Sequence, residues 1–105
     1  MMTVKELLKM HDDLTKGAKA LIEAKNHDYT SGSVSIFSNL DSCEILEVKS
    51  EVGILCRMLD KIKRLNSFAN SDQMKVKDES VDDTVQDIIN YAILFKAKLK
   101  SREEK

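Results

Sequence analysis

The sequence predicts an all-α domain, and three observations carry this prediction. Proline is absent and glycine occurs three times in 105 residues, so few residues interrupt a helix. Apolar residues recur at spacings of three and four over three long stretches. The β-like stretch at residues 33–37 is too short to build a sheet. We expect a single domain over residues 1–105, with three main helices in a bundle that oligomerisation completes.

Composition limits the classes of function. The net charge of -1 provides no overall basic field, so we expect no nucleic-acid partner. No run of 18 apolar residues occurs and the N-terminus lacks a signal-peptide core, so we expect no membrane partner. Cys43 and Cys56 fall in the same predicted helix, about 20 Å apart, which is too far for a disulfide. A reducing, cytoplasmic location fits these features, host cytoplasm if the chain is phage-encoded.

The first predicted helix covers about residues 3–25. Thr3 and Glu6 have the spacing of a capping box, in which each side chain bonds the other residue's backbone N–H. His11 lies within the apolar stripe, where we favour a core or interface role over a catalytic one. The stripe consists of Val4, Leu7, Leu8, His11, Leu14, Ala18, Leu21 and Ile22.

Residues 26–40 interrupt the helical period, and Gly32 with its neighbouring serines predicts a loop. A loop between long helices often carries function. We expect Val34, Ile36 and Phe37 to fix this loop to the core.

The second predicted helix runs from about Asp41 to Asn66. Gly53 lies inside it, at a cost of about 1 kcal/mol relative to Ala. Either close helix packing or space for a ligand beside Glu51 would account for this glycine. The predicted core stripe consists of Val48, Val52, Leu55, Leu59, Ile62 and Leu65.

A polar linker at residues 67–78 precedes the third predicted helix, which begins at Asp78 or Ser80 and ends near Ser101. Its apolar seam fits another helix, from this chain or from a partner subunit. The seam consists of Val81, Val85, Ile88, Ala92, Phe95 and Leu99. The basic residues from Lys96 to Arg102 are interpreted as a solvated helix end that complements the helix dipole.

Acidic residues recur one helical turn apart on two of the predicted helices. Glu47 and Glu51 align on the second helix, and Glu79, Asp83 and Asp87 align on the third. Like charges at this spacing repel, and oxygen ligands suit Mg²⁺ or Mn²⁺, so the pattern predicts a metal site. The helix dipole alone also favours acids in the first turn, but it does not explain Asp87, two turns in.

Four basic residues of the second helix have several possible partners. They could form ion pairs within the helix, meet Asp83 or Asp87 across the helix pair, or bind phosphate. The sequence leaves these alternatives open. The residues are Arg57, Lys61, Lys63 and Arg64.

Three segments resemble the phage and bacterial nucleotide modification associated domain 1 family: KNHDY (25–29), EVGILCRMLDKIKRL (51–65) and DESVDDTVQDIINYAIL (78–94). The third helix more distantly resembles the MazG-like all-α nucleoside triphosphate pyrophosphatases. Asp83, Asp87 and Tyr91 fall in the register of their acidic helix, and Glu51 matches one glutamate of their other motif. Ser50 and Ile54 depart from that motif, which often has glutamates there. Glu47 and Glu44, one and two turns upstream, are alternatives, since Glu44-x-x-Glu47 followed by Glu79-x-x-Asp82 also fits the general form of the motif with a longer spacer.

The resemblance implies Mg²⁺-dependent hydrolysis of a nucleoside triphosphate to monophosphate and pyrophosphate. The apolar seam of the third helix would be left exposed in one chain, so we expect a homodimer or tetramer. The implied metal ligands are Glu47, Glu51, Asp83 and Asp87, with Glu51 and Glu79 as catalytic residues. The implied nucleotide contacts are Lys25, Asp28, Tyr29, Arg57, Lys61 and Arg64. The departures at Ser50 and Ile54 favour an alternative, a non-catalytic helical module that binds a nucleotide or a protein, such as a phage accessory or counter-defence protein.

Overall fold

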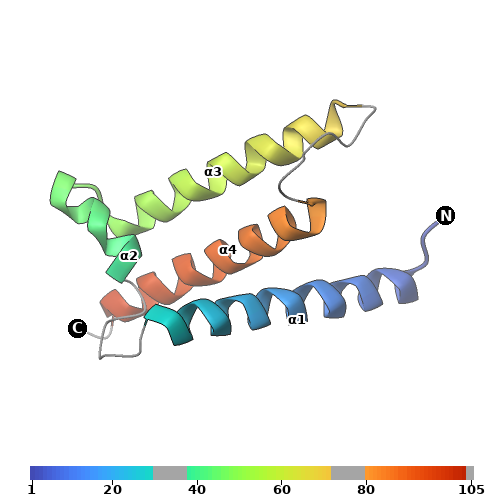
Figure 1. Ribbon diagram of the computed structural model, residues 1–105, viewed down its shortest axis with the longest axis horizontal. Helices are drawn as coiled ribbons and strands as arrows, with labels where there is room; N and C mark the ends of the chain where they lie inside the picture. The colour runs from blue at the N-terminus through green and yellow to red at the C-terminus, as the bar shows by residue number, and fades with distance from the viewer. Residues whose placement is uncertain (30–37, 72–79, 104–105) are drawn as a thin grey trace.

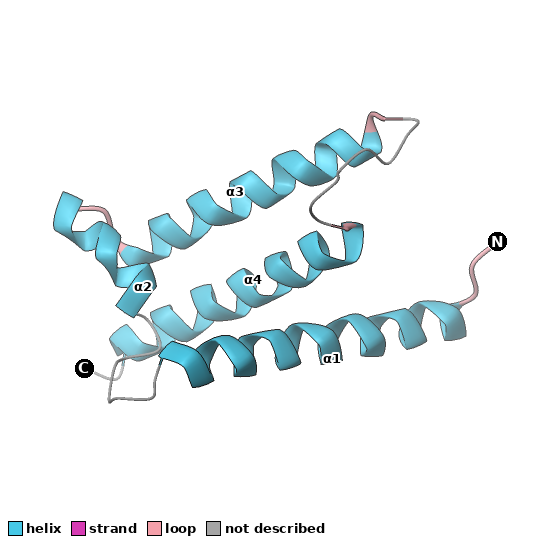
Figure 2. Ribbon diagram, viewed as in Figure 1, coloured by secondary structure: helices cyan, strands magenta, loops and turns pink. Residues whose placement is uncertain are grey.

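The computed structural model describes residues 1–29, 38–71 and 80–103, with the side chains of residues 26–29 and 38–39 excepted. Within these ranges the chain forms three long helices and no strand (Figure 2). The long helices are α1 (Val4–Tyr29), α3 (Ser50–Ala69) and α4 (Val81–Glu103). The short helix α2 (Ser38–Asp41) and the 3-10 helix η1 (Ser42–Leu46) precede α3. The predicted all-α class is confirmed.

Helix α4 is the centre of the molecule (Figure 1). Helices α1 and α3 both pack against α4, and in the described residues they do not contact each other. Most of the predicted seam of α4 therefore packs against helices of the same chain, because Val81, Val85, Ile88 and Phe95 are half-buried.

Helices α1 and α4 each begin with a capping box. The Glu6 N–H donates to Thr3 Oγ1 at 3.1 Å, and the Thr3 N–H donates to Glu6 Oε2 at 3.3 Å. The Asp83 N–H donates to Ser80 Oγ at 3.0 Å, and the Ser80 N–H donates to Asp83 Oδ2 at 3.4 Å. These bonds satisfy backbone donors that have no partner inside the helix, and they fix where α1 and α4 begin.

The predicted helix from Asp41 to Asn66 is wrong at its N-terminal end. The chain leaves the 3-10 helix at Glu47, whose φ of 61° is left-handed, and Lys49 is extended before α3 begins. A left-handed conformation is unfavourable for a non-glycine residue, so the residue type at position 47 does not predict this break. Cys43 and Cys56 consequently lie in different elements, and both are free thiols.

The predicted core stripe of this helix is also wrong, because most of its residues do not face α4. Val52, Leu55, Leu59 and Ile62 are each about half exposed. The buried face instead carries Ile54, which is fully buried and packs with Leu40. The half-buried side chains packed around this pair are Met58, Tyr91, Leu94, Phe95 and Ala97.

The apolar stripe of α1 is buried along part of its length only. Ala18 is buried against α4, whereas Val4, Leu7 and Leu8 are exposed. His11 is exposed as well, so it is not a core residue of this chain. No described helix combines the length and the apolar character needed to cross a membrane.

Candidate functional site

The C-terminal end of α4 meets the short helices and the start of α3 in a group of charged side chains. Lys98 Nζ lies 2.9 Å from Asp41 Oδ1, and Arg102 Nε lies 2.8 Å from Glu51 Oε2. A terminal nitrogen of Arg102 also lies 3.1 Å from Glu44 Oε1. We call Asp41, Glu44 and Glu51 the carboxylate cluster. Four elements (α2, the 3-10 helix η1, α3 and α4) thus bring three carboxylates and two cations together.

Ser50 occupies the middle of this arrangement. Its side chain is fully buried, and its hydroxyl lies within hydrogen-bonding distance of both Asp41 Oδ1 and Glu44 Oε1, the latter at 2.9 Å. A serine hydroxyl has one proton to donate, so two carboxylate oxygens share one donor. The rest of their negative charge is compensated by Lys98 and Arg102.

Burial and neighbouring charges shift the pKa values of Asp41, Glu51 and Arg102. Burial raises the pKa of Asp41, but the Ser50 hydroxyl and the Lys98 ammonium outweigh it and hold this pKa below its ordinary value. Burial likewise raises the pKa of Glu51, and the backbone N–H of Glu51 and the Arg102 guanidinium outweigh it. The hydrogen bond to Glu51 raises the pKa of Arg102. Asp41 and Glu51 are therefore ionised at neutral pH.

The four residues predicted as metal ligands are not brought together. Glu47 is exposed at the end of the 3-10 helix, so it does not align with Glu51 on one helix as predicted. Asp83 is exposed and caps α4. Asp87 lies 2.8 Å from Lys61 across the α3–α4 interface, and both side chains are less than one-fifth exposed. The described residues contain no group of three or more His, Cys, Asp or Glu side chains arranged to hold a metal ion.

The residues predicted to contact the nucleotide are also dispersed. Lys61 meets Asp87, which was one of the alternatives that the sequence left open, while Arg57 and Arg64 are exposed along α3. Arg64 stands 13 residues from Glu51, or about 20 Å along the helix. Lys25 is exposed on α1. Glu79 and the side chains of Asp28 and Tyr29 lie outside the described residues.

The sequence interpretation missed Asp41, Ser50, Lys98 and Arg102 as site residues. The basic C-terminal stretch was expected to be a solvated helix end, but Lys98 is only 8% exposed and is paired with Asp41. One signal for this was present. Lys98 follows Leu94 by four residues, which places it in phase with the buried face of α4. A lysine at a core position of a helix requires a partner.

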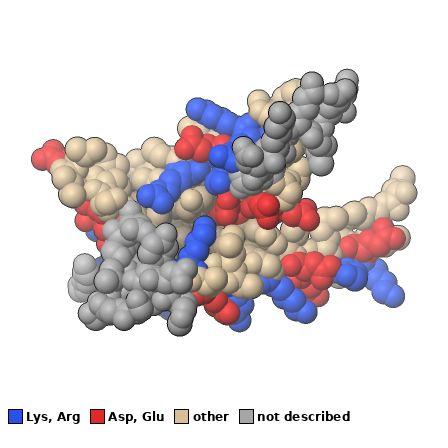
Figure 3. All heavy atoms as spheres, viewed as in Figure 1, with Lys and Arg blue, Asp and Glu red and all other residues tan. Residues whose placement is uncertain are grey.

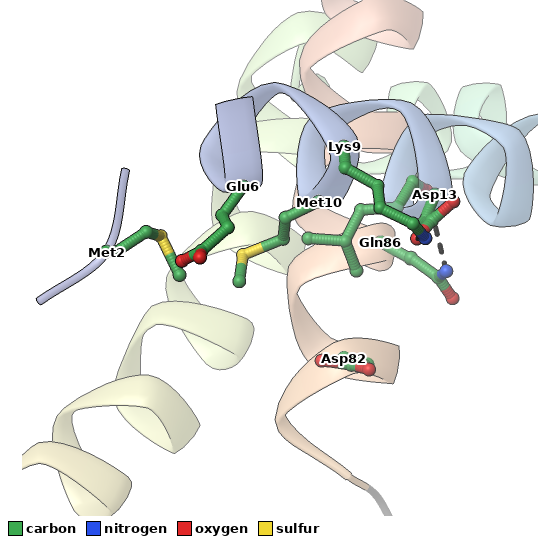
Figure 4. A pocket seen from close by; sticks show the side chains of 8 residues that line it. Met2, Glu6, Lys9, Met10, Asp13, Asp82 and Gln86 are labelled. Atoms are coloured by element: carbon green, nitrogen blue, oxygen red, sulfur yellow. Dashed lines mark hydrogen bonds and ion pairs between the residues drawn. The ribbon is translucent and has the colours of Figure 1, made fainter. Parts of the chain in front are cut away.

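A depression of about 410 Å³ lies between the N-terminal half of α1 and the start of α4 (Figure 4). Gln86 Nε2 donates to the Leu14 carbonyl at its edge. Three acids and one lysine line it, together with apolar side chains, so its electrostatic potential opposes a phosphate. Its lining residues are Met2, Glu6, Lys9, Met10, Asp13, Leu14, Asp82 and Gln86.

Basic and acidic side chains intermingle on the face of the molecule in Figure 3, with no separate basic patch on that face. The carboxylate cluster with Lys98 and Arg102 is the candidate site of this all-α protein. The chain belongs to the family described as nucleotide modification associated domain 1, whose model matches residues 25–99. Neither the curated proteins nor the solved structures include a match to this chain.

Proposed function

We propose that this protein is a Mg²⁺-dependent nucleoside triphosphate pyrophosphohydrolase that acts at the carboxylate cluster. Membership of a nucleotide modification associated family supports a nucleotide as the ligand. The observation that carries the proposal is the meeting of three carboxylates with Lys98 and Arg102 at one end of α4. A metal–nucleotide ligand carries charges of both signs, and this site offers partners for both.

The donor set suits the proposed metal. Asp41 and Glu44 offer carboxylate oxygens and Ser50 offers a hydroxyl, which are hard ligands of the kind that Mg²⁺ and Mn²⁺ prefer, and phosphate oxygens of the bound nucleotide would complete the coordination. When bound, the metal would neutralise phosphate charge and lower the pKa of a coordinated water. Asp41 and Glu44 are the favoured ligands because both already contact the same hydroxyl oxygen.

The cations of the site have a separate role in the proposal. The Arg102 guanidinium can form paired hydrogen bonds to phosphate oxygens, and Lys98 supplies a compact charge beside it. In the absence of nucleotide these two side chains stabilise the carboxylates. Exchange of their partners would link nucleotide binding to exposure of the metal ligands.

The test is pyrophosphate release from a panel of canonical and modified nucleoside triphosphates, with and without Mg²⁺. We expect turnover that requires Mg²⁺ and that falls at least tenfold in Asp41→Asn. Asp13→Asn is the control, because Asp13 is an exposed acid that pairs with Lys9 on α1. Asp87→Asn tests the site first predicted on α4. Loss of turnover in Asp87→Asn alone would move the site to the Lys61–Asp87 pair.

A non-catalytic binding module is the second candidate function. Each acid of the cluster already has a cationic or hydroxyl partner, which favours a site that binds a charged ligand without activating water. Calorimetry with nucleoside triphosphates and Mg²⁺ distinguishes the two candidates. Saturable binding without pyrophosphate release across the panel would support the module and contradict the hydrolase.

A further inference from the structure

Helix α3 carries a row of apolar side chains on the face that α4 does not cover. Val52, Leu55, Leu59 and Ile62 are 46%, 48%, 51% and 48% exposed. They recur at spacings of three, four and three residues, which places them in one row along the helix. We call these four residues the outer stripe. Leaving four large aliphatic side chains half exposed in one row is typical of an interface.

The small buried core of the described residues indicates that the outer stripe needs a partner. In the described residues, only Ala18, Leu40 and Ile54 are buried apolar side chains. A chain with so small a core is expected to gain much of its stability from a permanent partner.

The outer stripe is symmetric about its midpoint in both spacing and residue type. Its spacing of three, four and three is unchanged on reversal, its two ends are β-branched (Val52 and Ile62), and its two inner positions are both leucine. A two-fold axis near residue 57 would place Val52 opposite Ile62 of a second copy, and Leu55 opposite its Leu59. A dimer with two-fold symmetry requires such a self-complementary surface.

We infer that the outer stripe of α3 packs antiparallel against the same stripe of a second copy of this chain, about a two-fold axis near residue 57. The residues that flank the stripe nearest the axis are Cys56 and Met58, which carry no charge, so like-charge repulsion does not oppose approach there. Antiparallel packing also aligns the two helix dipoles favourably. The interface is independent of the nucleotide chemistry proposed above.

The first test is the mass of the full chain at micromolar concentration, by sedimentation or light scattering. We expect twice the chain mass of 11.9 kDa for the wild type, and the mass of one chain for Leu59→Glu. Leu8→Glu is the matched control, since Leu8 has a similar exposure of 59% but lies on α1. It should retain the wild-type mass. A monomeric wild type, or a Leu59→Glu variant with unchanged mass, would overturn the inference.

The second test examines the antiparallel register by charge pairing. Val52→Glu and Ile62→Lys should each weaken the dimer at least tenfold, because each places two charges in the apolar seam. The double variant should recover most of this affinity, because the acid of one copy then faces the base of the other. In a parallel pair, each new charge would face its own kind and the double variant would be weaker still. Failure of the double variant to recover would exclude the proposed register.

A third test uses the wild-type sequence, so it does not depend on how well the variants fold. The two Cys56 thiols are expected on either side of the axis and are exposed, whereas Cys43 is half-buried. A short bis-maleimide should therefore yield a covalent dimer of the wild type and none of Cys56→Ser. A covalent dimer that persists in Cys56→Ser, or no covalent dimer in the wild type, would place the interface elsewhere.

Discussion

The two sides of α4 are held by different polar chemistry. Toward α3 and the short helices, the described contacts are ion pairs: Asp87 with Lys61, Lys98 with Asp41, and Arg102 with Glu44 and Glu51. Toward α1, two neutral amides donate to backbone carbonyls. Asn90 Nδ2 lies 2.9 Å from the Ala18 oxygen, and Gln86 Nε2 lies 3.4 Å from the Leu14 oxygen.

The two kinds of contact, ion pairs and neutral hydrogen bonds, respond differently to pH and to charged ligands. An amide bonded to a carbonyl stabilises packing with little dependence on pH or salt, because neither group titrates. Ion pairs depend on both, and a charged ligand can exchange with them. The α1 side therefore fits a structural role, and the α3 side provides the chemistry proposed for a nucleotide.

The strongest test of this comparison is Lys98→Met. It leaves the Asp41 carboxylate without its cation in a partly buried position, and we expect a loss of about 2–4 kcal/mol in the free energy of unfolding. Lys96→Met is the matched control, because Lys96 is exposed on the same helix. Urea denaturation of both variants measures the effect. Equal stability of the two variants would show that the ion pair contributes nothing measurable.

The corresponding test on the α1 side is Asn90→Ala. Asn90 is 8% exposed, and its removal deletes a buried hydrogen bond and some packing, so we expect a loss of about 1–3 kcal/mol. The loss should be the same at neutral pH and below the ordinary pKa of Asp41, unlike that of Lys98→Met, because a protonated Asp41 no longer requires the lysine. Urea denaturation at two pH values measures both. A strong pH dependence for Asn90→Ala would remove the distinction between the two sides.

Two glycines allow a comparison between the packing of α3 on the 3-10 helix and the packing of α1 on α4. A Cβ on Gly53 would meet Cys43 Sγ at 2.8 Å, and this short side chain is held by contacts to the Leu40 and Val48 carbonyls. Gly53→Ala should therefore lose about 1–2 kcal/mol, despite the helix preference of Ala. Combining it with Cys43→Ala should recover stability. The close contact supports packing, rather than space for a ligand, as the reason for this glycine.

The matched change on the α1 side is Gly17→Ala. Its Cβ would meet the end of the Gln86 side chain, which can rotate away. The gain in helix preference, about 1 kcal/mol, then offsets the loss of a long hydrogen bond, and we expect almost no net change. Thermal melts compare the two glycine variants directly. A larger loss for Gly17→Ala than for Gly53→Ala would reverse the order of packing that we describe.

The smallest expected effect is the pH dependence of the α3 side. The pKa values of Asp41 and Glu51 are lowered in the folded chain from ordinary values of 3.8 and 4.5. A lowered carboxyl pKa contributes stability above the ordinary value, and this contribution is lost as the pH falls through the folded value. We expect the wild type to lose stability below about pH 4.5 more steeply than Lys98→Met, because the variant lacks one cause of the shift. Parallel curves would contradict this.

Local sequence signals determined much of the fold. The capping boxes at Thr3 and Ser80 act within four residues, so their residue types predicted where helices begin, and the absence of proline predicted helices that are long. Family membership also followed from the sequence segments that resemble it. These features depend on neighbours along the chain.

Tertiary structure decided which face of each helix is buried and which charges meet. The period of α3 offers two apolar faces, and only the position of α4 selects Ile54 over the outer stripe. The break at Glu47 has no local signal, because the contacts of Ser50 with Asp41 and Glu44 stabilise it from outside the turn. Lys98 and Asp41 are 57 positions apart, and Arg102 and Glu51 are 51 apart, so their pairing exists only once α4 lies against α3. The energy of an ion pair depends on the distance between the two charges in space, and the order of residues along the chain does not specify that distance.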